Sequence, residues 1–284
     1  MSAELPKSKE DLYAEQAAIE WLQELGWDHQ HGGDLAPNGP GLERTDYRDV
    51  VLISRLTDAV RRLNPELPPE AVQRVVELVL THTSPTVILD HESFHEFLVA
   101  GVPVTYIDED GVEPSPRAKL IDFDEPENNQ FVAVNQMTII AGSKIRRPDI
   151  LLYVNGLPLG QIEVKSPTHP QATPESAVNQ VAHYRDTIPD LYRFVEISGV
   201  SDLHQARVGT ITTPPEHFAE WKFMDEEAMK GKSALEVMLR GAFAPGTFLD
   251  LVKNFVLFES DGARTYKVMA KYHQVDAVNR AIEA

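Results

Sequence analysis

Residues 147–165 read RPDILLYVNGLPLGQIEVK, and this stretch decides the fold of the central region. Two mainly apolar runs, residues 149–154 and 157–165, predict neighbouring β-strands. Asn155-Gly156 joins them, and two-residue hairpin turns favour this dipeptide because both of its positions adopt positive φ. The stretch therefore predicts a β-hairpin with an acidic residue in each arm.

The elements around this hairpin alternate between helices and strands. Hydrophobic periodicity predicts helices over residues 9–26, 47–63, 70–82, 93–99 and 173–188. Strand patterns occupy residues 131–140, 192–198 and 206–213, with a broken strand-like stretch at 102–123. The Gly- and Pro-rich residues 29–42 predict a loop. This order indicates an α/β fold with a helical insertion over residues 43–101.

Beyond Trp221 the pattern becomes helical again, over residues 228–239, 248–258 and the amphipathic end of the chain. We therefore expect one domain over residues 1–222 and a helical segment over residues 223–284.

Composition excludes several function classes. The 284 residues include no cysteine, which rules out disulfide and thiolate chemistry and is compatible with a reducing cytoplasm. No uncharged apolar run is long enough to span a bilayer, so we expect no membrane partner and no signal peptide. The net charge of −18 argues against a protein that grips nucleic acid with its whole surface.

Three polar residues of the hairpin point to divalent-cation chemistry. Asp149 is followed, after thirteen intervening residues, by Glu163-Val164-Lys165. Phosphodiester hydrolysis needs a hard cation that activates water, and such cations take carboxylate and carbonyl oxygens. Asp149, Glu163 and the Val164 carbonyl would provide such ligands for Mg²⁺. On the spacing alone, the alternative is a common exposed strand face on which Glu and Lys alternate. Lys165 shares a strand face with Glu163, where it would orient water or stabilise charge on phosphate.

The turn decides whether the two carboxylates meet. With a regular two-residue turn, opposed residue numbers sum to 311, and Asp149 faces Ile162 while pointing away from Glu163. A longer odd loop or one β-bulge raises the sum to 312 and sets Asp149 opposite Glu163. Pro158 cannot donate to the ladder, which favours the longer loop. We predict that longer loop or a bulge.

Two further sets of polar residues accompany the hairpin. Lys144, Arg146 and Arg147 form a basic segment directly before Asp149, which we expect to contact DNA, with a solvated charge cluster as the alternative. Gln180 and Tyr184 lie four residues apart on a predicted helix and so share one face. They form either part of the site or only a polar rim.

A rival metal motif is His91-Glu92-Ser93-Phe94-His95, which satisfies the H-E-x-x-H pattern of zinc peptidases. The charged Glu96 that follows and the lack of an obvious third ligand favour polar residues on an exposed helix instead. Gly231-Lys232-Ser233 is not a phosphate-binding P-loop, because residue 226 is Glu where that loop needs Gly.

Short motifs across most of the chain carry a family resemblance. They are IDFDEPENN at residues 121–129, VNQ at 134–136, RRPDI at 146–150, VNGLPL at 154–159, EVKSP at 163–167, the spacing from Gln180 to Tyr184, FLDL at 248–251, NF at 254–255 and KYHQ at 271–274. The sequence resembles the N-terminal region of the restriction (R, motor) subunit of Type I restriction enzymes, within the PD-(D/E)xK nuclease superfamily. The resemblance implies a restriction-endonuclease-like mixed sheet flanked by helices, with the C-terminal helical segment leading toward motor domains that lie outside this chain.

The resemblance also implies roles for residues. By it, Asp149 and Glu163 ligate the metal and Lys165 is the catalytic lysine. Gln180 and Tyr184 match an additional nuclease motif. Members of the superfamily often add a carboxylate from the first helix, for which Glu15 is the candidate.

The implied function is that of a Type I site-specific deoxyribonuclease: Mg²⁺-dependent endonucleolytic hydrolysis of double-stranded DNA in the cytoplasm of a bacterium or archaeon. The implied partners are DNA, methylase and specificity subunits, and the subunit's own motor domains, with ATP bound only by those domains. The alternative is a catalytically silent module with the same fold that docks or couples the other subunits.

Overall fold

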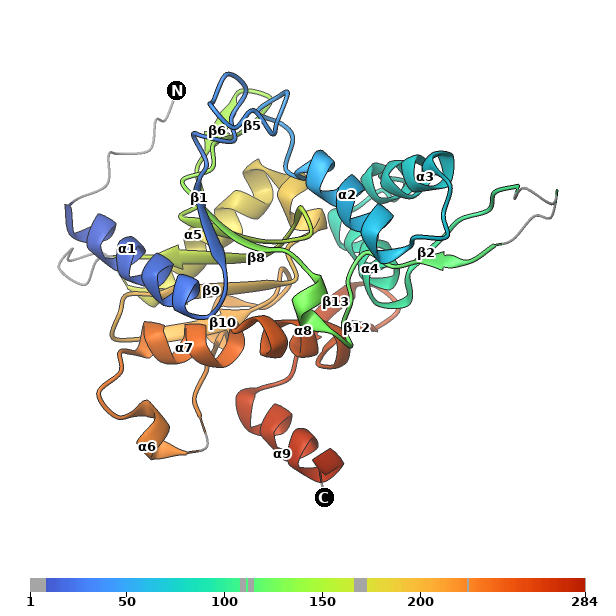
Figure 1. Ribbon diagram of the computed structural model, residues 1–284. Helices are drawn as coiled ribbons and strands as arrows, with labels where there is room; N and C mark the ends of the chain where they lie inside the picture. Colours follow the sequence, from blue (N-terminus) through green and yellow to red (C-terminus); the bar gives the residue numbers. More distant parts are fainter. Residues whose placement is uncertain (1–8, 108–110, 112–114, 166–172, 224, 284) are drawn as a thin grey trace.

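A seven-stranded mixed sheet forms the centre of the molecule (Figure 1), for which a computed structural model describes residues 9–107, 111, 115–165, 173–223 and 225–283. The strand order is β1-β4-β7-β8-β9-β10-β11. The strands are β1 (Asp28–His31), β4 (Phe131–Asn135), β7 (Ile150–Val154), β8 (Leu157–Val164), β9 (Ile197–Ser201), β10 (Ala206–Gly209) and β11 (Ala219–Glu220). β1 pairs parallel with β4 and β8 with β9, and the other neighbours are antiparallel. The predicted mixed α/β architecture is confirmed.

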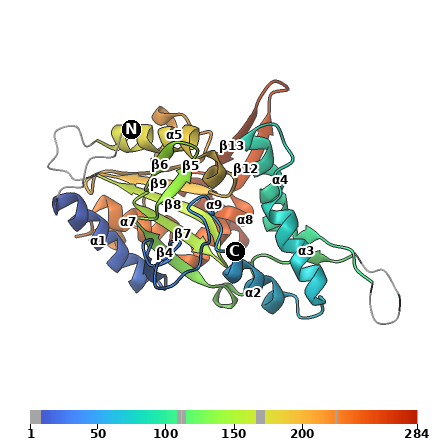
Figure 2. The same ribbon diagram turned by 90° about the horizontal axis from the view of Figure 1, so that it is seen from above.

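Helices cover both faces of this sheet (Figures 1 and 2). One face carries α5 (Pro174–Thr187), and the other carries α1 (Lys9–Glu24), α7 (Ala234–Ala242) and α8 (Pro245–Asn254). Every residue of β7 and β8 is buried. Strands covered on both faces lack a polar side, which is why these two have near-continuous apolar sequences. A polar side chain within them therefore stands out as a candidate functional group.

Helix α5 begins as its sequence predicts. The Thr173 hydroxyl accepts the Ser176 N–H, the Ser176 hydroxyl accepts the Thr173 N–H, and Pro174 occupies the first turn. This reciprocal cap satisfies amides that have no partner within the helix. The cap fixes the start of the helix that covers the end of β8.

The predicted helical insertion lies at one side of the sheet (Figure 1). It contains α2 (Ile53–Leu63), α3 (Pro69–Leu80) and α4 (Val87–Ala100), followed by the short strands β2 (Val102–Pro103) and β3 (Arg117–Ala118). Helix α2 begins six residues later than predicted, because the Asp49 carboxylate accepts the N–H groups of Thr45 and Asp46 and forms a turn there. Helix α4 begins six residues earlier than predicted.

The prediction of a loop from residue 29 is wrong at its start. Residues Asp28–His31 form the edge strand β1, parallel to β4. Its sequence, DHQH, has no apolar residue, so no hydrophobic alternation indicates a strand. β1 exists because the adjacent buried strand β4 offers it a hydrogen-bonding edge.

The C-terminal region differs from the helical segment predicted. It contains α6 (Glu226–Met229), α9 (Tyr272–Glu283) and a hairpin formed by β12 (Val256–Ser260) and β13 (Thr265–Met269). The hydrophobic core continues across residue 222, since Phe248 of α8 packs against Trp27 with ring centroids 5.9 Å apart. Ser233 caps α7 through the Glu236 N–H and is not part of a phosphate loop. No helix in the described part of the chain is long and apolar enough to span a membrane.

The remaining elements position loops around the sheet. They are the small hairpin β5 (Ile139–Ala141) and β6 (Lys144–Arg146), and the 3-10 turns η1 (Pro126–Asn128), η2 (Pro189–Arg193) and η3 (Pro215–His217).

Candidate functional site

A β-bulge sets the register of the central hairpin. Asn155 (φ 52°) and Gly156 (φ 83°) form the two-residue turn, so Val154 pairs with Leu157. The register then shifts, and Leu152 pairs with Gly160, leaving Leu159 as the extra residue. The predicted bulge is confirmed, whereas the longer loop favoured by Pro158 is not formed.

The shifted register brings the two carboxylates to one end of the hairpin. Ile150 pairs with Ile162, so Asp149 and Glu163 follow as the next opposed positions. The Val164 N–H donates to Asp149 Oδ2 at 2.8 Å, which ties the two chain segments together. Asp149 and Glu163 are 1% and 0% exposed. Buried carboxylates at adjacent strand positions are costly unless they serve a cation or a hydrogen-bond network.

Lys165 links the end of β8 to α5. Its Nζ lies 3.0 Å from Glu163 Oε1 and also donates to the Gln180 Oε1 atom. The Gln180 Nε2 atom donates to the Tyr184 hydroxyl at 2.6 Å. The structure thus brings Glu163, Lys165, Gln180 and Tyr184 into one chain of contacts. The spacing of four on the predicted helix face anticipated this arrangement.

Glu15 of α1 lies at the same end of the sheet and contacts the end of β4. The amide nitrogens of Asn135 and Gln136 donate to its two carboxylate oxygens at 2.8 and 2.7 Å. The Gln136 backbone N–H donates to the Asp149 carbonyl at 3.0 Å, and Gln136 has a left-handed φ of 55°. Asn135 and Gln136 were quoted as a motif but given no role from the sequence, because their partner is distant in the chain. Ligation of a metal by Glu15 stays a prediction.

The donor set fits a magnesium ion. Within the described ranges, no group of three or more His, Cys, Asp or Glu side chains could hold a metal by itself. A cation at this end of the hairpin would have two side-chain ligands, the Asp149 and Glu163 carboxylates, and its binding stays a prediction. This ligand set suits Mg²⁺, which keeps several waters and uses one or two carboxylates together with substrate phosphates.

The negative charge of Glu163 also affects the pKa of a neighbouring tyrosine, Tyr192. Burial, together with the charge of Glu163, raises the pKa of the Tyr192 phenol well above its ordinary value. The Tyr192 hydroxyl donates to Gln161 Oε1 at 2.5 Å, two residues before Glu163 on the same strand face. Tyr192 therefore remains a neutral hydrogen-bond donor to Gln161.

The basic segment before Asp149 divides into two parts. Lys144 and Arg147 are exposed, whereas Arg146 is 7% exposed. The Arg146 guanidinium bonds Thr187 Oγ1 at 3.1 Å and His183 Nε2 at 2.7 Å on α5. We therefore assign Arg146 to holding α5 against β6. The predicted DNA contact stays a prediction for Lys144 and Arg147, which are open to solvent.

The zinc-peptidase alternative is contradicted by the surroundings of its histidines. His91 and His95 both approach Glu196, with His95 Nδ1 3.0 Å from Glu196 Oε2. The cation between His91 and Glu196 is the ammonium of Lys267 from β13. His91, Glu196 and Lys267 are fully buried, which leaves no opening for a substrate. Glu92, the residue that would activate water, is exposed instead.

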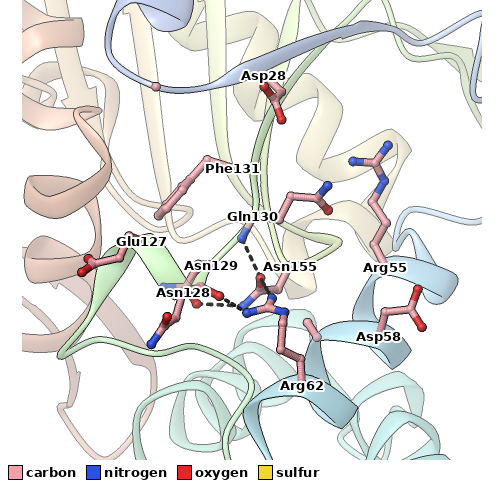
Figure 3. Close-up of a pocket in the computed structure, with 12 residues that line it drawn as sticks. Asp28, Arg55, Asp58, Arg62, Glu127, Asn128, Asn129, Gln130, Phe131 and Asn155 are labelled. Carbon is pink, nitrogen blue, oxygen red and sulfur yellow. Dashed lines mark hydrogen bonds between the residues drawn. The ribbon is translucent and has the colours of Figure 1, made fainter.

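The IDFDEPENN motif has a structural role at the turn end of the hairpin, away from Asp149. It lines a cavity of about 660 Å³ with α2 (Figure 3). Buried Asn155 accepts the Gln130 N–H at 2.9 Å and donates to Asn129 Oδ1 at 2.8 Å and to the Leu120 carbonyl at 2.9 Å. Arg62 of α2 reaches Asn155 Oδ1 at 3.3 Å. The motif therefore holds the Asn-Gly turn in place. Residues 166 and 167 of the EVKSP motif lie outside the described residues.

The fold and the site are those of a restriction-endonuclease-like protein. A mixed sheet lies between layers of helices, and two carboxylates and a lysine meet at a bulged hairpin of that sheet. The family model for the Type I restriction enzyme R protein N terminus matches residues 7–217, and the chain belongs to this family.

Two curated relatives illustrate the similarity. The chain is 37% identical to the Type I restriction enzyme HindI endonuclease subunit of Haemophilus influenzae, over 95% of this chain and 26% of that protein. It is 29% identical to the putative Type I restriction enzyme MjaIXP endonuclease subunit of Methanocaldococcus jannaschii, over 100% of this chain and 28% of that protein. The chain thus spans about a quarter of the length of the curated relatives it matches. The resemblance stated from the sequence motifs is confirmed at the level of the family.

Proposed function

We propose that this chain is the Mg²⁺-dependent nuclease domain of a Type I restriction system and hydrolyses phosphodiester bonds of double-stranded DNA. One observation carries the proposal: the bulge at Leu159 sets a register in which Asp149 meets Glu163 and the Val164 backbone. The Lys165 ammonium lies 3.0 Å from the Glu163 carboxylate at the same point. The relatives are named as endonuclease subunits, which supports this reaction class.

The acidic residues of the site would serve as metal ligands. A bound Mg²⁺ supplies a Lewis acid that polarises a phosphoryl oxygen and lowers the pKa of water. Asp149 and Glu163 would hold it. The N–H and C=O groups of one strand residue point to the same side, so the Val164 carbonyl faces Asp149 as its N–H does. It would complete the protein's share of the ligands.

Lys165 would stabilise the negative charge that develops on the phosphate. A preorganised cation in a water-poor site does this more effectively than solvent can. Gln180 accepts a hydrogen bond from the Lys165 ammonium, and Tyr184 accepts one from the Gln180 amide. These two residues are therefore positioning residues, which hold the lysine in place.

Delivery of DNA would come from outside this chain. Its charge of −18 opposes strong independent binding to a polyanion. We propose that methylase and specificity subunits, and motor domains that bind ATP, belong to the longer subunit and its complex in a bacterial or archaeal cytoplasm. The 284 residues would then contribute the cleavage chemistry.

The test is cleavage of supercoiled plasmid by the assembled complex carrying Asp149→Ala or Lys165→Ala. We expect each variant to lose about 100-fold or more in cleavage rate, the effect of removing one group that stabilises the transition state. ATP hydrolysis by the same complexes serves as the assembly control, and Lys230→Ala, at an exposed lysine, as the matched variant. Undiminished cleavage by either site variant contradicts the proposal and leaves the silent docking module as the function.

A further inference from the structure

The β5–β6 hairpin carries an exposed apolar residue between exposed basic ones. Ile145 is 57% exposed, and Lys144 before it and Arg147 after it are exposed as well. Together they form a locally basic surface with an apolar residue at its centre, on a chain whose net charge is −18. The combination favours a partner that offers both phosphates and an apolar groove surface.

The hairpin is held firmly at its base. On one side, Arg146 is anchored to Thr187 and His183 of α5. On the other, the Ile140 N–H donates to the Tyr47 carbonyl at 3.1 Å, and Arg44 donates to the Thr138 carbonyl at 2.9 Å. A hairpin fixed in this way presents Ile145 without a large ordering cost on binding.

The hairpin lies beside the candidate site. β6 ends at Arg146, and Asp149 follows three residues later. The strands pair from Ile139 opposite Arg146 to Ala141 opposite Lys144, so they extend about 7 Å before the turn at Gly142, which has φ 57°. The major groove of B-DNA is about 12 Å wide and admits a two-stranded ribbon. A short two-stranded ribbon such as this one therefore fits within such a groove.

We propose that the β5–β6 hairpin enters the major groove of the DNA next to the phosphate to be cleaved. Ile145 contacts the apolar surface of the groove, and Lys144 and Arg147 pair with phosphates on either side. The inference rests on the proposed nuclease function, for which it names the element that positions duplex DNA.

The test measures binding of the 284-residue chain to a fluorescent DNA duplex of about 20 base pairs, two helical turns. The buffer contains little salt, so that even the weak independent binding expected of an acidic chain is measurable, and no Mg²⁺, so that cleavage plays no part. We expect Ile145→Ser to weaken binding about tenfold, the effect of leaving one aliphatic side chain unburied. Its control is Leu257→Ser, because Leu257 is 60% exposed on the other hairpin, β12–β13, beside Glu259. This control is expected to bind as the unchanged protein does.

The salt dependence of binding tests the two basic residues. The double variant Lys144→Ala/Arg147→Ala is expected to reduce the slope of log affinity against log salt concentration by about 2, because two phosphate contacts are lost. An Ile145→Ser variant that binds like Leu257→Ser, an unchanged salt slope, or no measurable duplex binding would each overturn the proposal. Loss of subunit assembly by Ile145→Ser without a change in DNA binding would overturn it too, in favour of a protein interface. None of these results depends on Asp149, so they are distinct from failure of the cleavage assay.

Discussion

Replacing Lys267 with methionine is expected to destabilise the fold strongly, although Lys267 is far from the candidate site in sequence. Its ammonium is buried and contacts Glu196 and His91. Burial alone would raise the pKa of Glu196, but the charges of Lys267, His91 and His95 hold it well below its ordinary value. Methionine has a similar length and no charge. In this variant the Glu196 carboxylate must stay charged without its cation or take up a proton.

The magnitude follows from this buried pair. Removing one partner of a buried ion pair typically costs about 3–5 kcal/mol, because the other charge is left uncompensated. Replacing both partners with neutral groups costs much less for the same reason. We therefore expect Lys267→Met to lower the free energy of unfolding by about 3–5 kcal/mol, and Lys267→Met/Glu196→Gln to recover most of that loss.

The assay is urea unfolding of Lys267→Met, Glu196→Gln and the double variant at pH 7.5, analysed as a double-mutant cycle. Lys253→Met is the matched control, since Lys253 pairs with Asp124 at the surface, where such a bridge contributes about 1 kcal/mol or less. A loss below about 1 kcal/mol for Lys267→Met would refute the reasoning. So would a double variant whose loss equals the sum of the two single losses.

Two further perturbations address the turn and the response to acid. Asn155→Ala is expected to lower the free energy of unfolding by about 2–4 kcal/mol in urea titrations, because it leaves buried partners of Asn155 unsatisfied at a residue with left-handed φ. Asn254→Ala, which changes an exposed side chain, is the control. Equal losses for the two variants would contradict the role given to Asn155. Burial and the charge of Lys267 lower the pKa of His91 to about 3. The unfolded chain therefore binds this proton first, and the free energy of unfolding should fall as the pH drops below about 6.5, by at most about 1.4 kcal/mol per pH unit. Glu196, whose folded pKa is depressed, adds a loss below its ordinary pKa of 4.5. Urea midpoints from pH 7.5 to 4 should show a shallower decline for His91→Gln, and identical declines would exclude His91 as the cause.

The sequence is sufficient to predict the parts of the fold that local chemistry determines. The Asn155-Gly156 turn, the cap at Thr173 and the buried strands β7 and β8 all follow from residues close together in the chain. β1 could not be predicted, because its stability comes from pairing with β4, a hundred residues away. The β12–β13 hairpin was missed as well, because the apolar residues at the start of β12 continue the apolar period of the preceding helix α8.

In the candidate site too, features that depend on nearby residues could be predicted, and contacts between distant residues could not. Strand spacing made Asp149, Glu163 and Lys165 candidates, and the family resemblance gave them their roles. The register argument limited the outcomes for the two carboxylates to two. The contact of Glu15 with Gln136 was not accessible, since it joins α1 to the end of β4 across more than a hundred residues. The histidines of the H-E-x-x-H motif indicated a zinc site that is not formed, for a related reason. Their cation is a lysine from a distant strand, and no local pattern reveals it.

A single inserted residue connects these features. Without Leu159 in the bulge, the two-residue turn would oppose Asp149 to Ile162, and Glu163 would point to the other face of the sheet. The Leu159 carbonyl is not left without a donor, because the Glu196 N–H donates to it at 2.7 Å. Glu196 is in turn fixed by Lys267 of the C-terminal hairpin. The register that aligns the two carboxylates is therefore supported by a buried ion pair between Glu196 and Lys267, and Lys267 lies beyond the predicted domain boundary at 222.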